Sequence, residues 1–158
     1  MKTWLLFFAL LLYSVLTDAK ETYFHTELGG FAPTVKVGFD RELNERWDFK
    51  GGIGCFVLGP SLIAYNLYYS YKITNPEKKF NFNVNFGMLD SYYVYNEHVS
   101  FGFGIAPGIG LKTKKGGKLN FRLGFITGPS IEPDRNRWLT IPDFGLEYDF
   151  QWRKKPGK

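Results

Sequence analysis

The sequence predicts an all-β protein folded as an eight-stranded, antiparallel, up-and-down barrel. The first observation is period-two alternation, clearest in FNFNVNFG (80–87), where Phe or Val alternates with Asn. Such alternation describes a strand with two unlike faces. The second observation is that this period recurs from about Thr22 to Arg153, with turn signals between the runs and no helical segment of any length. The third is a high aromatic content of 19%, because aromatic residues favour strands.

Eight runs fit the alternating pattern. The expected strands are 22–29, 33–41, 46–57, 62–73, 79–89, 98–112, 118–128 and 141–153. Most of them approach the ~9–11 residues that a tilted strand needs to cross a bilayer. From the second strand onward the apolar faces are Val35, Val37 and Phe39; Trp47, Phe49, Ile53, Cys55 and Val57; Ile63, Tyr65, Leu67, Tyr69, Tyr71 and Ile73; Phe80, Phe82, Val84 and Phe86; Val99, Phe101, Phe103, Ile105, Ile109 and Leu111; Leu119, Phe121, Leu123 and Phe125; and Phe144, Leu146, Tyr148, Phe150 and Trp152.

The connections fall into two sets, which an up-and-down barrel places at opposite ends. The first set shares an end with both termini and consists of short turns rich in Asn, Pro or Gly, at 43–45, 74–78 and 113–117. The second set comprises 30–33, 58–61, 90–97 and 129–140, and its last two members are longer. Short turns at the terminal end and longer loops at the far end are typical of outer-membrane barrels.

The small residues of the 98–112 strand indicate which face of the barrel is inside. Eight strands enclose space just sufficient for side chains, so the bulky apolar rows do not all fit there. Opposite the apolar row, this strand carries Ser100, Gly102, Gly104, Ala106, Gly108 and Gly110. Glycine weakens a strand and has no use on a solvated face, whereas a crowded interior needs it. The sequence therefore predicts a transmembrane barrel with apolar side chains outside and polar ones inside.

The polar face carries amides and charges of both signs, which could pair within a closed lumen. The expected lumen residues are Glu27, Lys36, Asp40, Asp48, Lys50, Asn81, Asn83, Asn85, Arg122, Glu147 and Asp149. The alternative is a solvated face of mixed charge on a soluble barrel or sandwich.

Aromatic residues also gather at the strand ends, as expected of two membrane-interface belts. The belt near the short turns would contain Trp47, Tyr69, Tyr71 and Trp152, and the far belt Tyr92, Tyr93, Tyr95 and Trp138.

The chain begins with a pattern typical of a secretory signal peptide. Lys2 precedes an apolar run from Trp4 to Leu16, and small residues lead to a cleavage site expected after Ala19. An N-terminal anchor is the alternative, although the run is shorter than the ~20 residues of a spanning helix. The expected organisation is a signal peptide at 1–19, a barrel domain at 20–153 and a basic tail at 154–158.

The sequence indicates neither a disulfide nor a cofactor. Cys55 is the single cysteine, so an internal disulfide cannot form. No cysteine or histidine cluster has the spacing of metal ligands, and no cofactor motif is present.

With a signal segment, eight alternating strands and an aromatic final strand (FGLEYDFQW, 144–152), the chain resembles the small outer-membrane barrels of the OmpA-transmembrane and OmpX type. The resemblance is architectural and covers the whole mature chain. It implies secretion through the inner membrane and location in a bacterial outer membrane. Such barrels usually end at the last aromatic residue, whereas here RKKPGK (153–158) follows.

The first functional hypothesis is a non-enzymatic outer-membrane protein with a structural or interaction role and a closed polar lumen. Its partners would be the lipid bilayer and, through the 90–97 and 129–140 loops, lipopolysaccharide or an extracellular partner. Nucleic acid is not expected, because no binding fold is recognisable. The second hypothesis is a soluble, secreted or periplasmic, lipocalin-like barrel that binds a lipophilic ligand.

A third and weaker hypothesis is an outer-membrane enzyme that hydrolyses acyl chains of lipids. Its candidate catalytic residues are Glu97, His98 and Ser100, because a serine with a histidine base and a carboxylate can perform acyl transfer. Outer-membrane lipid A deacylases carry a lipid-facing His-x-Ser pair on the strand before the final loop. The corresponding positions here are Ile126 and Gly128, and His98 is expected to point inward.

Overall fold

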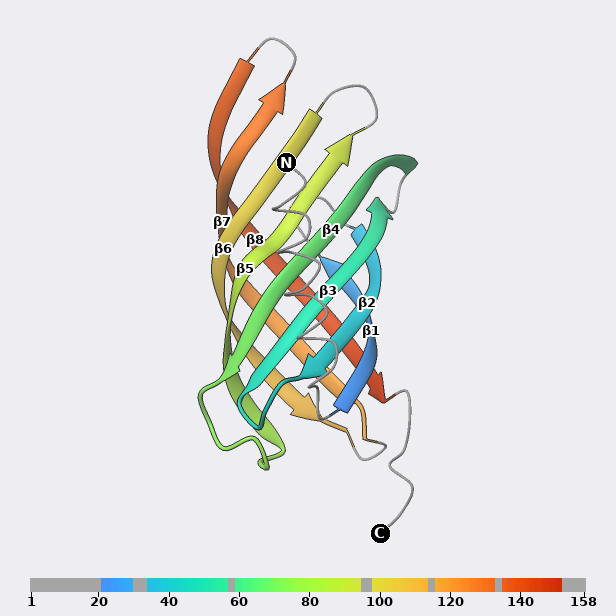
Figure 1. The fold of residues 1–158 in the computed structure, drawn as a ribbon, viewed down its shortest axis with the longest axis vertical. Coiled ribbons are helices and arrows are strands. Elements are labelled where there is room, and N and C mark those ends of the chain that lie inside the picture. The colour runs from blue at the N-terminus through green and yellow to red at the C-terminus, as the bar shows by residue number, and fades with distance from the viewer. Residues whose placement is uncertain are drawn as a thin grey trace, which may run out of the picture.

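The chain folds as a closed, eight-stranded antiparallel barrel, which confirms the predicted fold class. The computed structural model describes residues 21–29, 34–56, 59–94, 98–113, 116–132 and 135–151. The strands are β1 (Glu21–Gly29), β2 (Thr34–Glu42), β3 (Trp47–Phe56), β4 (Gly59–Lys72), β5 (Phe80–Val94), β6 (His98–Lys112), β7 (Lys118–Glu132) and β8 (Arg135–Gln151). Figure 1 shows them tilted around a common axis. The signal peptide expected at 1–19 and the tail expected at 154–158 lie outside the described residues.

Each strand pairs with its neighbours in sequence, and β1 pairs with β8 to close the barrel. This closing ladder runs from Tyr23↔Gln151 to Gly29↔Gly145 and is the shortest among the described strands. The longest ladder joins β7 to β8 and runs from Lys118↔Asp149 to Glu132↔Arg135. None of the described residues forms a helix long and apolar enough to cross a membrane.

Period-two alternation places side chains on the two faces of the barrel wall. In β2, Thr34 and Lys36 are buried, whereas Val35 and Val37 are exposed. In β5, Phe80, Phe82 and Phe86 are exposed, and the three asparagines between them are buried. The apolar rows therefore line the outside of the barrel, and the polar rows point into it.

The two long connections predicted at 90–97 and 129–140 are largely strand. β5 continues to Val94 and β6 starts at His98, so that only 95–97 separate them. Likewise β7 continues to Glu132 and β8 starts at Arg135. Figure 1 shows both hairpins rising beyond the ends of β1 and β2. The prediction was wrong because polar residues such as Asp90, Asn136 and Arg137 can pair within a strand as readily as they form a loop.

A β-bulge in β5 reverses the alternation along that strand. The register with β6 passes from Met88↔Phe103 to Asp90↔Gly102, so Leu89 is an extra residue. Such an insertion turns all later side chains to the opposite face. Gly87 lies just before the bulge with a φ of 131°, a conformation that favours glycine. Leu89 keeps the inward face of Asn85, the inserted residue turns Asp90 inward as well, and both side chains are fully buried.

Candidate functional site

The interior of the barrel is a network of buried polar and charged side chains. All eleven side chains that the sequence assigned to the lumen are buried there: Glu27, Lys36, Asp40, Asp48, Lys50, Asn81, Asn83, Asn85, Arg122, Glu147 and Asp149. They come from β1, β2, β3, β5, β7 and β8, so the closed ladder brings together residues that are far apart in sequence. Buried charges are tolerated when they are paired and hydrogen-bonded.

Arg122 is the centre of the cluster toward the far end. Its Nη2 lies 2.9 Å from Glu27 Oε1 and its Nε lies 3.1 Å from Asp143 Oδ2. Lys36 Nζ lies 2.9 Å from the same oxygen of Glu27 and 2.8 Å from Asp90 Oδ1. Two cations thus hold three carboxylates that are contributed by three different strands.

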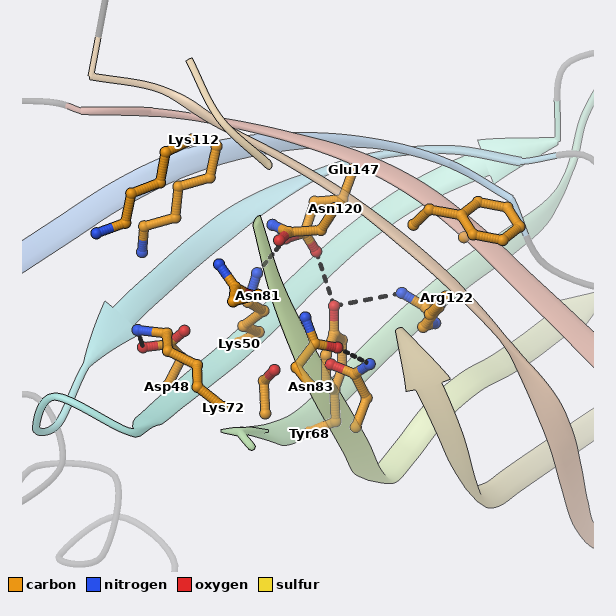
Figure 2. A pocket seen from close by; sticks show the side chains of 15 residues that line it. Asp48, Lys50, Tyr68, Lys72, Asn81, Asn83, Lys112, Asn120, Arg122 and Glu147 are labelled. Carbon is orange, nitrogen blue, oxygen red and sulfur yellow. Dashed lines mark hydrogen bonds and ion pairs between the residues drawn. The ribbon is translucent and has the colours of Figure 1, made fainter. Parts of the chain in front are cut away.

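Lys50 is the centre of a second cluster, halfway along the barrel. Its Nζ contacts Glu147 Oε1 and lies 3.3 Å from Asp149 Oδ2 and 3.4 Å from Asp40 Oδ2. Asn120 Nδ2 donates to both Glu147 (3.0 Å) and Asp149 (2.7 Å). Figure 2 shows Lys50, Asn120 and Glu147 gathered in the barrel interior.

Tyr68 connects the two clusters. Its hydroxyl donates to Glu147 Oε2 at 2.7 Å and accepts from Arg122 Nη1 at 3.3 Å, as the dashed lines of Figure 2 mark. The side chain is 2% exposed and was not among the predicted lumen residues. In IAYNLYYSYK (63–72) tyrosines occur on both faces of β4, so the apolar pattern gives no signal that this one is internal.

Replacing Tyr68 with phenylalanine is expected to lower the free energy of unfolding by about 1–3 kcal/mol, because Glu147 loses a hydrogen bond inside the barrel. Urea unfolding of the chain refolded in lipid vesicles measures the change. Tyr69→Phe on the outer face of the same strand is the matched control and should change stability by less than about 0.5 kcal/mol. Equal effects of the two substitutions would contradict the linking role of Tyr68.

A third cluster lies at the short-turn end. Lys118 Nζ lies 2.7 Å from Glu42 Oε1 and 3.9 Å from the ring centroid of Tyr23. Lys72 Nζ lies 2.9 Å from Asp48 Oδ1 and 3.3 Å from Glu42 Oε1. Lys72 and Lys118 were not among the predicted lumen residues, because both lie at strand ends beside the short turns. Both lysines nevertheless fall on the inward-facing positions of the alternating pattern in their strands, and this pattern could have identified them.

The asparagines of β5 pack against the glycines of β6. Asn85 Nδ2 donates to Asn83 Oδ1 (2.9 Å) and to the carbonyl of Ala106 (3.0 Å). A Cβ atom on Gly108 would collide with the Asn83 amide, and one on Gly110 would collide with Asn81. The small residues on β6 therefore leave the volume that the amides fill.

An apolar cluster lies inside the barrel beside the Arg122 cluster. Leu89, Ala106 and Ile126 are almost fully buried, and Ile141 packs against them. The cavity between the polar clusters has a volume of about 20 Å³, which is room for about one water molecule. Within the part of the barrel that the structure describes, side chains fill the middle of the interior, and a wider pocket opens at the short-turn end, beside Glu42, Arg46 and Lys72.

The predicted aromatic belts are only partly described. Trp47 lies 4.8 Å from Tyr71 and 6.4 Å from Tyr69, measured between ring centroids, and Trp138 is exposed at 71%. Tyr92 does not belong to a belt: the bulge turns it inward, where it is buried and its hydroxyl contacts Asp90. Trp152 and Tyr95 lie outside the described residues, as does the side chain of Tyr93.

Two of the candidate catalytic residues, His98 and Ser100, lie at the far end of the barrel. His98 and Ser100 belong to β6, where they pair with Val94 and Tyr92 of β5. Their side chains and the whole of Glu97 lie outside the described residues. The acyl-hydrolase hypothesis stays a prediction.

Compared with known protein families, the chain matches no family model, and a comparison with curated proteins gives no significant match.

Proposed function

We propose that the chain is an integral outer-membrane β-barrel with a structural or interaction role, and that it is not a porin. One observation carries the proposal: exposed large apolar side chains encircle the barrel, while its interior is charged. They occur on or directly beside all eight strands and are Phe24, Leu28, Val35, Val37, Ile53, Ile63, Ile73, Phe80, Phe82, Phe86, Phe103, Ile105, Ile109, Phe121, Leu123, Phe125, Trp138, Leu139, Phe144, Leu146, Tyr148 and Phe150.

A continuous apolar band favours a lipid environment over water. Soluble monomers rarely expose a contiguous apolar patch larger than roughly 300–600 Å². A closed barrel satisfies its backbone hydrogen bonds internally, which is the condition for strands to cross a bilayer. The cluster of Trp47, Tyr69 and Tyr71 lies at the short-turn end, where an interfacial aromatic belt would be.

The filled interior disfavours the other transport and binding roles. A porin needs an aqueous channel, whereas Lys50, Tyr68 and Arg122 fill the middle of this barrel. A lipocalin-like protein needs an apolar interior cavity for its ligand, and the interior here is charged. We place the interaction role at the ends of the β5–β6 and β7–β8 hairpins, which extend beyond β1 and β2 and would face lipopolysaccharide or an extracellular partner.

Membrane fractionation with heat-modifiable gel mobility tests this proposal. The chain is expected in the outer-membrane fraction, released by detergent but not by high salt or alkaline carbonate. The unheated sample should migrate faster than the boiled one, because the closed barrel resists dodecyl sulfate. A monomer that stays soluble without detergent would contradict the proposal and favour the soluble alternative.

A further inference from the structure

His25 occupies a slot inside the barrel wall between β8 and β2. Its backbone pairs with Asp149 on one side and with Gly38 on the other, and Gly38 pairs in turn with Gly52. A Cβ atom on Gly38 would approach His25 Nε2 to 2.7 Å, and one on Gly52 to 3.2 Å. The imidazole thus fills the space that two adjacent glycines leave, and it is 1% exposed.

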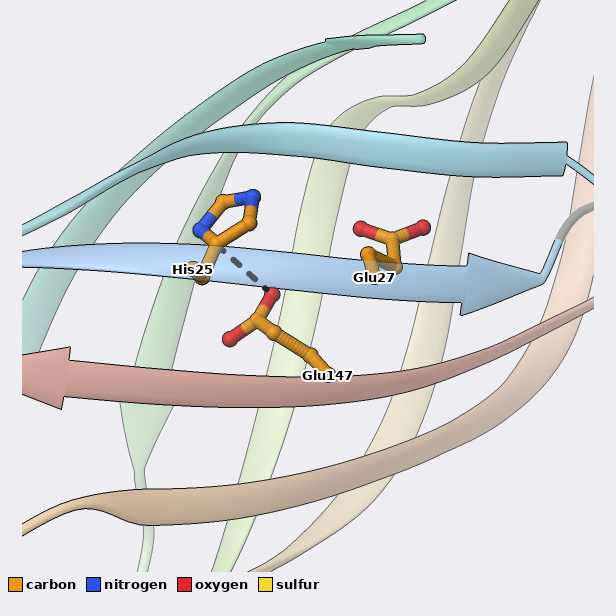
Figure 3. A group of neighbouring side chains, drawn as sticks. All are labelled: His25, Glu27 and Glu147. Atoms are coloured by element: carbon orange, nitrogen blue, oxygen red, sulfur yellow. Dashed lines mark ion pairs between the residues drawn. The ribbon is translucent and has the colours of Figure 1, made fainter. Parts of the chain in front are cut away.

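Neither nitrogen of His25 has a hydrogen-bond partner among the described residues. Nδ1 faces two carboxylate oxygens, Asp149 Oδ1 at 3.8 Å and Glu147 Oε2 at 4.0 Å, and Figure 3 shows His25 and Glu147 pointing toward each other from β1 and β8. Asp149 Oδ1 is likewise buried without a hydrogen bond. Leaving such groups unsatisfied is unfavourable by about 1–3 kcal/mol each.

Of the two oxygens that face the imidazole, Asp149 Oδ1 has no hydrogen bond, whereas Glu147 Oε2 also accepts one from the Tyr68 hydroxyl at 2.7 Å. Lys50 contacts Glu147 Oε1 and Asp149 Oδ2, which are the oxygens that point away from His25. The ligand atoms of His25, Glu147 and Glu27 all lie within 4.8 Å of one another.

The buried charges of the described interior are unbalanced. Seven fully buried carboxylates, together with the partly buried Glu42 that holds Lys72 and Lys118, face five buried cations. The carboxylates are Glu27, Asp40, Asp48, Asp90, Asp143, Glu147 and Asp149, and the cations are Lys36, Lys50, Lys72, Lys118 and Arg122. Carboxyl groups therefore outnumber cationic side chains in this interior, which favours a further cation over a further anion.

The geometry points to a buried binding site for a divalent transition-metal ion of the zinc class, with His25 Nδ1, Asp149 Oδ1 and Glu147 Oε2 as its ligands. Imidazole nitrogen and carboxylate oxygen are ligands that Zn²⁺ and Cu²⁺ accept. Bonds of about 2.0–2.1 Å in a tetrahedral site separate neighbouring ligand atoms by about 3.3 Å. The two carboxylate oxygens, now 3.8 and 4.0 Å from Nδ1, would therefore each move toward it by roughly half an ångström. This proposal does not depend on whether the barrel lies in a membrane. The proposed ligands stand at positions 25, 147 and 149, a spacing that matches no known metal-binding motif.

The test is to refold the chain in detergent micelles with Zn²⁺ or Cu²⁺, remove free metal on a desalting column, and measure metal per chain. About one ion per folded chain is expected for the unaltered protein. His25→Ala should lower the affinity about tenfold or more, since even outer-shell changes weaken metal sites about 10–100-fold. His98→Ala, which removes the only other histidine in the sequence, is the matched control and should retain the metal.

A spectroscopic measurement on the unaltered protein covers the case in which His25→Ala does not fold. Electron paramagnetic resonance of the Cu²⁺-loaded chain should show coupling to one imidazole nitrogen, and Asp149→Asn should weaken Cu²⁺ binding. Failure of the unaltered folded chain to retain metal would overturn the site. So would equal retention by His25→Ala, or a Cu²⁺ spectrum without nitrogen coupling.

Discussion

Replacing Arg122 with methionine is expected to lower the free energy of unfolding by about 3–5 kcal/mol, because it leaves buried carboxylates uncompensated. The guanidinium lies 2.9 Å from Glu27 and 3.1 Å from Asp143, and it donates to the carbonyl of Leu89. Glu27 keeps Lys36 as a partner, whereas Arg122 is the only described cation paired with Asp143. Urea unfolding of the chain refolded in lipid vesicles measures the loss.

The matched control for Arg122→Met neutralises its partner as well. Asp143→Asn alone leaves the guanidinium without one carboxylate, and the double variant leaves no charge at either position. The double variant should therefore be less destabilised than the sum of the two single losses. Strictly additive losses would show that Arg122 and Asp143 are not coupled.

Replacing the next residue, Leu123, with arginine is expected to destabilise the membrane-inserted barrel by about 2–4 kcal/mol if the position lies near the bilayer midplane. Leu123 is 56% exposed and lies between Phe121 and Phe125 in the outer apolar row of β7. An arginine there would have to enter hydrocarbon. Unfolding equilibria in lipid vesicles and the fraction of chain that folds from urea both report the effect.

Leu123→Phe keeps the outer row apolar and is expected to fold like the unaltered chain. If the barrel were soluble, Leu123 would face water, and its replacement by arginine would leave stability within about 0.5 kcal/mol. That outcome would contradict the proposed membrane location. Positions 122 and 123 thus test the two faces of one strand with opposite changes of polarity.

The face of each side chain could be predicted from the sequence because strand geometry fixes it. Successive side chains of a strand point to opposite faces, so the alternation in TVKVGFDRE (34–42) already separates Lys36 from Val35 and Val37. The glycines opposite the apolar row of β6 indicated a crowded interior, and Asn83 and Asn85 occupy the volume beside them. These inferences need only one strand at a time.

Pairings across the barrel could not be predicted in this way. Arg122 meets Glu27 only because β8 pairs with β1, and the two residues are 95 positions apart. The bulge at Leu89 was also missed, since an inserted residue leaves no clear composition signal in GMLDSYYV (87–94). It turned Tyr92 from an expected belt residue into an interior one.

The short ladder between β1 and β8 has a consequence for how the barrel closes. Few backbone hydrogen bonds join these two strands, but buried polar side chains lie on both. His25 and Glu27 come from β1, Glu147 and Asp149 come from β8, and Glu27 also pairs with Arg122 of β7. In an open sheet these groups would remain hydrated. Closing the β1–β8 junction would therefore also remove these groups from water, and reopening it would separate Glu27 from Arg122.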